Sequence, residues 1–163
     1  MTIGAVNRLD AAGFVGAFGG VYEDSPWVAE RAFARRPFVS LNDLCDKMQA
    51  TMDAAAVDEQ LALLRAHPDL GTRAKVSESS ASEQAGVGLD QLTAEEYSRL
   101  TDLNNRYREK FGFPFLYAVK GSNKEAILAA LEARYGNTPE IEFRTALGQV
   151  HRIARFRMED LVG

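Results

Sequence analysis

Residues 93–112 read TAEEYSRLTDLNNRYREKFG and contain a complete helix signature. Residues 93–96, which read TAEE, are a start signal, because a threonine followed by acidic residues is typical of a helix N-terminus. Gly112 is a stop signal, because glycine readily adopts the left-handed conformation in which many helices end. Between these signals, one stripe at helical spacing is formed by Tyr97, Leu100, Asn104, Tyr107 and Phe111. The stretch predicts a long helix with one buried face.

Similar start and stop signals recur along the chain. They predict six further helices, with approximate bounds at residues 10–18, 25–33, 40–52, 54–66, 122–136 and 138–161. Asp10 is expected to cap the first of these, Ser25 and Pro26 to begin the second, and Ser40 to begin the third. No segment shows alternating β-branched residues, and no Asn-Gly or Asp-Gly pair marks a hairpin. The sequence predicts an all-α fold, a single domain over residues 1–163 that forms a bundle of about seven to eight helices.

Two segments do not fit a helical pattern. Residues 71–88 are rich in serine and glycine, and we expect residues 71–79 to lie outside any long helix. Residues 113–119 read FPFLYAV and are expected to form an extended wall of a pocket. Irregular segments of this length in a compact domain often carry function.

The composition narrows the class of protein. The chain has 46% hydrophobic residues, which is enough for a core. Its 19 basic and 23 acidic residues give a net charge of −4, which argues against a nucleic-acid binder. Its single cysteine, Cys45, excludes an internal disulfide and favours a reducing compartment. No apolar run approaches the roughly 20 residues that span a bilayer, and the N-terminal residues lack the pattern of a secretory signal. We expect a soluble, cytoplasmic protein that binds neither nucleic acid nor membrane.

One of the two histidines lies where a helix has to end. Residues 63–71 read LLRAHPDLG, and Pro68 disfavours helical geometry at His67, the residue before it. A side chain held at such a break can face a cleft, and imidazole titrates near neutral pH. The alternative is that His67 only interacts with the carbonyls at the end of its helix.

Arg157 interrupts an apolar face of the last predicted helix. At 100° per residue it falls inside the arc formed by Phe143, Leu147, Val150, Ala154 and Leu161. A guanidinium on a core-facing stripe needs an anionic partner, because an unpaired buried charge is costly. That partner is either a structural carboxylate or a carboxylate or imide-like substrate bound through two hydrogen bonds. A third alternative is that the side chain extends to the helix end, where water solvates the charge, and all three stay open.

Glu83 and Gln84 lie in the serine-rich segment and also have two interpretations. Ser80-x-x-Glu83 has capping-box spacing, so Glu83 could serve only a helix start. The dense group of hydroxyl, carboxylate and amide side chains could instead bind a heterocyclic substrate. His67, His151 and Cys45 lack metal-ligand spacing, and no serine or cysteine lies in a nucleophile motif. If the chain is an enzyme, the remaining possibility is acid–base chemistry without a cofactor.

Taken together and in order, several segments resemble the OHCU decarboxylase family, where OHCU is 2-oxo-4-hydroxy-4-carboxy-5-ureidoimidazoline. The segments are residues 22–28, 64–70, 80–84, 103–104 with Tyr107, 111–115, and the last helix at Ile153 and Arg157. The resemblance covers nearly the whole chain and implies an all-α fold, a homodimer, and no metal or organic cofactor. It departs from the family after Gln84, where the chain reads AGVGL over residues 85–89.

The resemblance also implies roles for individual residues. His67, Glu83 and Arg157 take the positions of the family's catalytic histidine, catalytic glutamate and substrate-binding arginine, and we expect the three to converge. The substrate-binding positions are Pro68, Ser80, Ala81, Ser82, Glu83, Gln84, Phe115, Leu116, Tyr117, Ala118 and Val119.

The expected function is the decarboxylation of OHCU to (S)-allantoin in urate catabolism. The alternative is a non-catalytic ligand-binding or regulatory module on the same fold. A chaperone J-domain also contains His-Pro-Asp, but its preceding helix is typically basic, whereas residues 53–66 hold Asp53, Asp58 and Glu59 against Arg65 alone. A J-domain is also about half as long as this chain.

Overall fold

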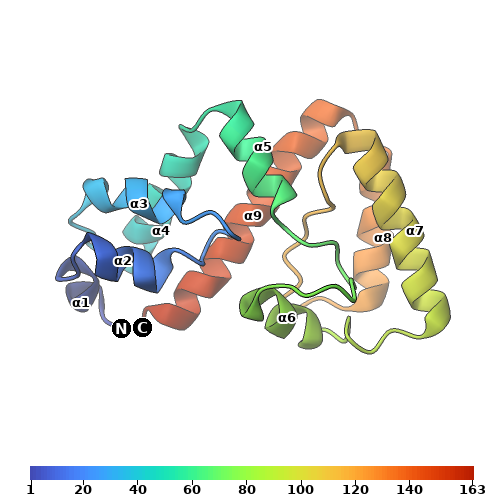
Figure 1. Ribbon diagram of the computed structural model, residues 1–163, viewed down its shortest axis with the longest axis horizontal. Helices are drawn as coiled ribbons and strands as arrows, with labels where there is room; N and C mark the ends of the chain where they lie inside the picture. The colour runs from blue at the N-terminus through green and yellow to red at the C-terminus, as the bar shows by residue number, and fades with distance from the viewer. The chain divides into compact units, whose positions relative to one another are not determined.

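The computed structural model describes residues 1–163, and its regular secondary structure is entirely helical (Figure 1). Nine α-helices and one 3-10 turn are present, which confirms the all-α prediction. The chain forms two compact units, described separately below: unit 1 comprises residues 1–66 and 151–163, and unit 2 comprises residues 67–150. That the chain is a single domain stays a prediction.

Unit 1 is built around clustered phenylalanines. Its elements are α1 (Ile3–Asn7), α2 (Ala11–Phe18), α3 (Trp27–Ala32), the 3-10 turn η1 (Phe33–Arg35), α4 (Leu41–Asp53), α5 (Val57–Arg65) and the end of α9 (Pro139–Leu161). The ring of Phe14 lies 4.9 Å from that of Phe18 and 5.7 Å from that of Phe38, centroid to centroid, and all three are buried. The two chain ends meet, because the Met1 ammonium donates to the Leu161 carbonyl at 3.1 Å.

Unit 2 contains the helix predicted from residues 93–112. Its elements are α6 (Glu78–Ala85), α7 (Ala94–Phe111), α8 (Lys124–Tyr135) and the beginning of α9. Thr93 Oγ1 accepts from the Glu96 N–H at 3.1 Å, Glu96 Oε1 accepts from the Thr93 N–H at 3.0 Å, and Gly112 ends the helix at φ 79°. Tyr107 on α7 is fully buried against Phe111 and Phe115, at ring-centroid distances of 4.6 and 5.4 Å. The predicted start, stripe and glycine stop are confirmed, and the start has the form of a capping box.

Two helices were not predicted. Helix α1 has five residues, too few to leave a periodic stripe in the sequence. Helix α6 lies within residues 71–88, so the irregular assignment was wrong for residues 78–85. Its cap is Ser77, whose hydroxyl accepts from the Ser80 N–H at 3.1 Å. The suggested capping box of Ser80 and Glu83 is wrong as well, because both residues lie inside the helix.

Two further details differ from the sequence-based expectations. Ser25 does not cap α3: its hydroxyl donates to the Glu23 carbonyl at 2.8 Å, and the helix begins at Trp27. On α9, Leu161 is 39% exposed, whereas Arg157 and Glu142 are buried. The buried stripe of α9 is therefore rotated from the predicted arc and includes two charged residues.

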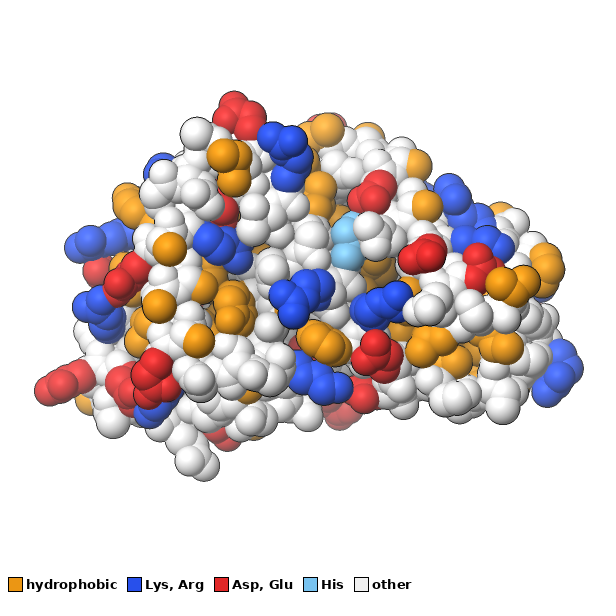
Figure 2. Space-filling view, turned by 180° about the vertical axis from the view of Figure 1, so that it is seen from behind, with side chains coloured by type: hydrophobic (Ala, Val, Ile, Leu, Met, Phe, Trp, Pro, Cys, Tyr) orange, Lys and Arg blue, Asp and Glu red, His pale blue; other side chains and the backbone are white.

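The surface carries charges of both signs. Acidic and basic side chains are interspersed over the face shown in Figure 2 rather than gathered by sign. None of the helices combines the length and apolar composition that crossing a membrane requires.

Candidate functional site

His67 follows the end of α5 directly, as the break at Pro68 predicted. Helix α5 ends at Arg65, Ala66 is its C-cap, and the Ala66 N–H still bonds to the Ala62 carbonyl at 3.0 Å. His67 is the first residue of unit 2 and is only 6% exposed. Its imidazole is thus largely shielded from solvent and attached to a segment that cannot continue the helix, which suits a group that moves a proton.

The turn after His67 is fixed by side chains from two helices of unit 2. Asn104 Nδ2 on α7 donates to the Leu70 carbonyl at 2.9 Å, and Gln84 Oε1 on α6 accepts from the Gly71 N–H at 2.9 Å. Gly71 has φ +74°, and a Cβ there would lie 2.6 Å from Leu100 Cδ2. The sequence placed Asn104 on a stripe but gave no sign that it bonds this turn.

Helix α6 presents three of the five predicted binding residues of its region on one face. Ser80, Glu83 and Gln84 are spaced i, i+3 and i+4, and Ser80 and Gln84 are buried while Glu83 is half-buried. Ala81 and Ser82 are exposed on the opposite side. A helix face, rather than a loop, therefore carries the carboxylate, hydroxyl and amide of this segment.

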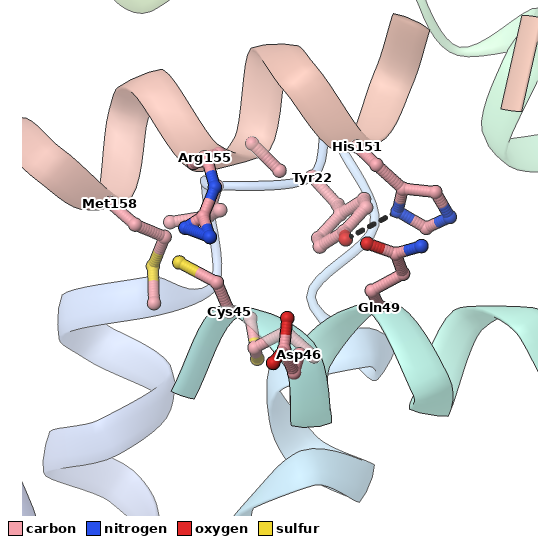
Figure 3. Close-up of a pocket in the computed structure, with 10 residues that line it drawn as sticks. Tyr22, Cys45, Asp46, Gln49, His151, Arg155 and Met158 are labelled. Atoms are coloured by element: carbon pink, nitrogen blue, oxygen red, sulfur yellow. Dashed lines mark hydrogen bonds between the residues drawn. The ribbon is translucent and has the colours of Figure 1, made fainter. Parts of the chain in front are cut away.

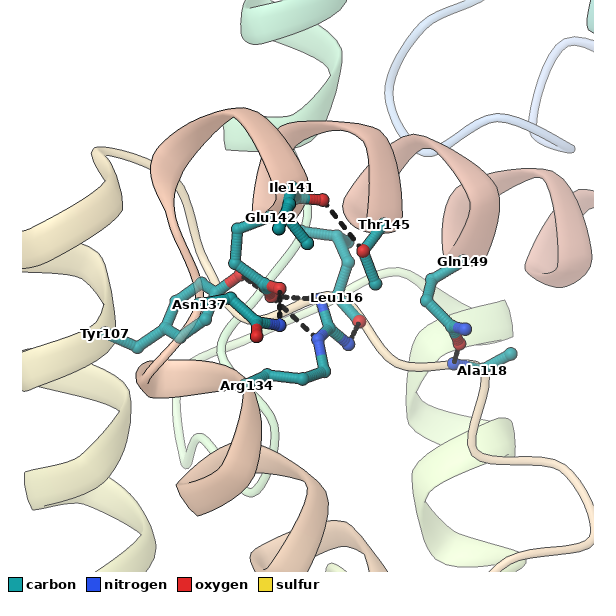
Figure 4. Close-up of polar contacts among 9 residues, drawn as sticks. All are labelled: Tyr107, Leu116, Ala118, Arg134, Asn137, Ile141, Glu142, Thr145 and Gln149. Carbon is teal, nitrogen blue, oxygen red and sulfur yellow. Dashed lines mark hydrogen bonds and ion pairs between the residues drawn. The ribbon is translucent and has the colours of Figure 1, made fainter.

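The other predicted binding segment, residues 115–119, has no helix or strand, as expected for residues 113–119. All of its residues are buried except Tyr117, which is half-buried and pairs its hydroxyl with that of Ser122 at 2.8 Å. The Leu116 carbonyl accepts from Arg134 Nη1 at 2.6 Å, and the Ala118 N–H donates to Gln149 Oε1 at 2.9 Å (Figure 4). The backbone of this segment is thus held by side chains.

Glu142 is the centre of a buried polar cluster that the sequence analysis missed. It has no exposed surface, and its carboxylate accepts from the Tyr107 hydroxyl at 2.5 Å, Arg134 Nε at 2.7 Å and Asn137 Nδ2 at 2.9 Å (Figure 4). Burial, and then the bond to Glu142, raises the pKa of Tyr107, which therefore stays protonated as a donor. A signal was available: Glu142 precedes Ala146 and Val150 at helical spacing on the buried stripe of α9.

Arg157 lies in unit 1, where it has the carboxylate partner that its position on a buried stripe required. Its Nη2 lies 2.8 Å from Glu23 Oε2, and the two side chains are 7% and 2% exposed. Its Nη1 donates to the carbonyls of Gly20 and Val21 at 3.2 and 3.4 Å. The structural carboxylate is confirmed, and substrate binding by Arg157 and its convergence with His67 and Glu83 stay predictions.

A small pocket of about 40 Å³ in unit 1 is lined in part by His151, the second histidine (Figure 3). His151 Nε2 lies 2.9 Å from Asp53 Oδ1, and His151 Nδ1 lies 2.8 Å from the Tyr22 hydroxyl. Because a carboxylate can only accept, His151 Nε2 carries the proton and Nδ1 accepts from Tyr22. Burial lowers the pKa of His151, although Asp53 opposes the shift. The pocket has room for a few water molecules rather than a heterocyclic substrate.

Comparison with known proteins gives matches over almost the whole chain. The sequence model of the OHCU decarboxylase family matches residues 7–159. A 2-oxo-4-hydroxy-4-carboxy-5-ureidoimidazoline decarboxylase from Haloferax volcanii is 49% identical over 160 residues, which cover 98% of this chain and 95% of the relative. The enzyme of that name from Mus musculus is 39% identical over 162 residues, covering 97% of this chain and 91% of the relative.

This chain is also similar to solved structures. The crystal structure of an (S)-allantoin synthase has a TM-score of 0.79 and 34% identity, with 99% of this chain and 54% of that one covered. An OHCU decarboxylase crystallised in the presence of (S)-allantoin has a TM-score of 0.72 and 25% identity, with 86% of this chain and 94% of that one covered. Full-length relatives, the family model and the helical fold agree: the chain belongs to the OHCU decarboxylase family.

Proposed function

We propose that the chain catalyses the cofactor-independent decarboxylation of OHCU to (S)-allantoin, a step of urate degradation. The observation that carries the proposal is the near full-length similarity to the Haloferax volcanii decarboxylase, at 49% identity. The position of His67, buried at the end of α5 beside Pro68, supports it independently.

The reaction makes demands that ordinary side chains can meet. The bond to the carboxylate breaks, CO₂ leaves, and the bonding electron pair passes into the conjugated imidazolinone ring. One proton then adds to the ring carbon that becomes the stereocentre. Because the ring itself accepts the electron pair, the protein has to orient the substrate, stabilise developing negative charge and deliver the proton to one face.

We assign these tasks to three residues. His67 delivers the proton, Glu83 orients the substrate hydroxyl or the imidazole, and Arg157 anchors an anionic or carbonyl oxygen of the substrate. Arg157 suits this task because Glu23 and two backbone carbonyls hold its planar guanidinium in one orientation.

We assign ring binding to Pro68, to the α6 face that carries Ser80 and Gln84, and to residues 115–119. Two observations support this assignment. The bond from the Gly71 N–H to Gln84 ties the turn after His67 to α6, and side-chain bonds to Leu116 and Ala118 fix the backbone of residues 115–119.

The test is to replace His67 by asparagine and to follow freshly generated OHCU by the circular dichroism of the allantoin produced. We expect the enzymatic rate to fall by about 10²–10⁴, the usual effect of removing a positioned acid–base group. The product should also become racemic, because a proton that comes from water reaches both faces of the ring equally. His151→Gln is the matched control: it changes the other histidine, retains groups for both of its hydrogen bonds, and should still give the (S) product.

A His67→Asn variant that makes (S)-allantoin at the wild-type rate would exclude His67 as the proton donor. The alternative function, a ligand-binding module without catalysis, predicts that the wild-type chain binds allantoin but leaves the decay of OHCU unchanged. We further propose that the chain works as a cytoplasmic homodimer, for which light scattering should give about twice the 17.9 kDa mass of one chain.

A further inference from the structure

The segment 115–119 poses a hydrogen-bonding problem. It is buried apart from Tyr117, yet it belongs to no helix or strand that would pair its backbone groups. A buried peptide group without a partner costs free energy, so such a segment needs donors and acceptors from elsewhere. Two of its backbone groups find them on side chains, those of Arg134 and Gln149.

Arg134 reaches the segment from α8 and is itself held rigidly. Its Nη1 donates to the Leu116 carbonyl at 2.6 Å while its Nε donates to Glu142 Oε1 at 2.7 Å, and the side chain is 13% exposed. Because a guanidinium is planar, the second bond fixes the direction of the first. Glu142 is fixed in turn by Tyr107 and Asn137.

Gln149 reaches the segment from α9. Its Oε1 accepts from the Ala118 N–H at 2.9 Å (Figure 4). It follows Glu142 by seven residues, close to two helical turns, so both project from one face of α9. The helix thus acts on the segment at two points, on Ala118 directly and on Leu116 through Arg134.

We infer that Arg134 and Gln149 are positioning residues for the second binding segment, which they hold in the one conformation that accepts substrate. This inference rests on the proposed function. Neither residue is assigned contact with the substrate. When one of the two bonds is lost, the segment occupies other conformations, and the apparent affinity for substrate falls with the fraction that stays competent.

The kinetic test compares three variants of α9. Gln149→Met keeps the length of the side chain but cannot accept a hydrogen bond, whereas Gln149→Glu keeps an acceptor oxygen. Thr145→Ala is the control, because the Thr145 hydroxyl bonds only to the Ile141 carbonyl of its own helix. With OHCU as substrate, we expect Gln149→Met to raise KM about tenfold with kcat within about twofold, and Gln149→Glu to restore KM to within about threefold.

A second readout needs no turnover. Amide hydrogen exchange at Ala118 should be slow in the wild type, in Thr145→Ala and in Gln149→Glu, and at least about tenfold faster in Gln149→Met. Equal exchange in the wild type and Gln149→Met overturns the inference, and so does a Gln149→Glu variant as impaired as Gln149→Met. A wild-type chain that leaves OHCU decay unchanged refutes the proposed function, whereas a raised KM confined to Gln149→Met supports both the proposed function and the inference.

Discussion

The buried ion pair of Arg157 and Glu23 makes a quantitative prediction about stability. Glu23→Gln keeps the shape of the side chain and removes its charge, which leaves the guanidinium of Arg157 without the carboxylate at 2.8 Å. The two groups are 7% and 2% exposed, so water cannot easily replace the lost partner. The hydrogen bonds from Arg157 to the Gly20 and Val21 carbonyls remain.

The expected loss follows from these contacts. Breaking a buried ion pair by removing one partner costs about 3–5 kcal/mol. Because two carbonyls still face the guanidinium, we expect the lower end, about 3 kcal/mol of unfolding free energy. For a chain of this size, each kcal/mol lowers Tm by about 2–4 °C, so the shift should be about 6–12 °C.

Thermal and urea unfolding followed by circular dichroism measure this loss. A double-mutant cycle with Arg157→Gln should give a coupling energy of about 2 kcal/mol or more, near the upper part of the range for residues in direct contact. Asp102→Asn is the control, since its ion pair with Arg106 is more than half exposed and should contribute at most about 1 kcal/mol. If Glu23→Gln costs no more than Asp102→Asn, the pair is not a desolvated one and the reasoning fails.

Two further predictions concern the turn after His67 and the second histidine. Gly71→Ala should lower the unfolding free energy by about 2–4 kcal/mol, because alanine is strained at φ +74° and its Cβ would lie 2.6 Å from Leu100 Cδ2; a melting temperature equal to that of the wild type would contradict it. Burial lowers the pKa of His151 in the folded chain. As the pH falls below about 6.5, the unfolded chain therefore binds more protons than the folded chain, and the stability contributed by the neutral ring is lost. Urea titrations between about pH 7.5 and 5.5 should therefore show the wild type losing stability relative to His151→Gln, and parallel pH profiles would rule this out.

The helices were predictable because their signals are local. Capping residues, apolar spacing and stop glycines act within about one helical turn, so Thr93, Glu96 and Gly112 fix the ends of α7 whatever surrounds it. Where the local signal is weak, the prediction failed: α1 is too short for a stripe, and the serine-rich α6 has no apolar face to reveal it.

The candidate site was predictable in part. The sequence located His67 at a helix break and Arg157 on a buried face, because each violates a local pattern. It could not identify Glu23 as the partner of Arg157. The two residues are 134 positions apart, which leaves no periodic trace, and several carboxylates satisfy the same charge requirement.

The tertiary structure alone decided how the irregular segments are held. The hydrogen bonds between Asn104 and Leu70, between Arg134 and Leu116 and between Gln149 and Ala118 join residues 34, 18 and 31 positions apart. A hydrogen bond between a side chain and a distant backbone group depends on where two elements pack, and packing is set by the whole core rather than by neighbours in the chain. The sequence by itself thus determined seven of the nine α-helices and the unusual positions of His67 and Arg157, and only the packed fold determined which side chains hold the backbone of the irregular segments.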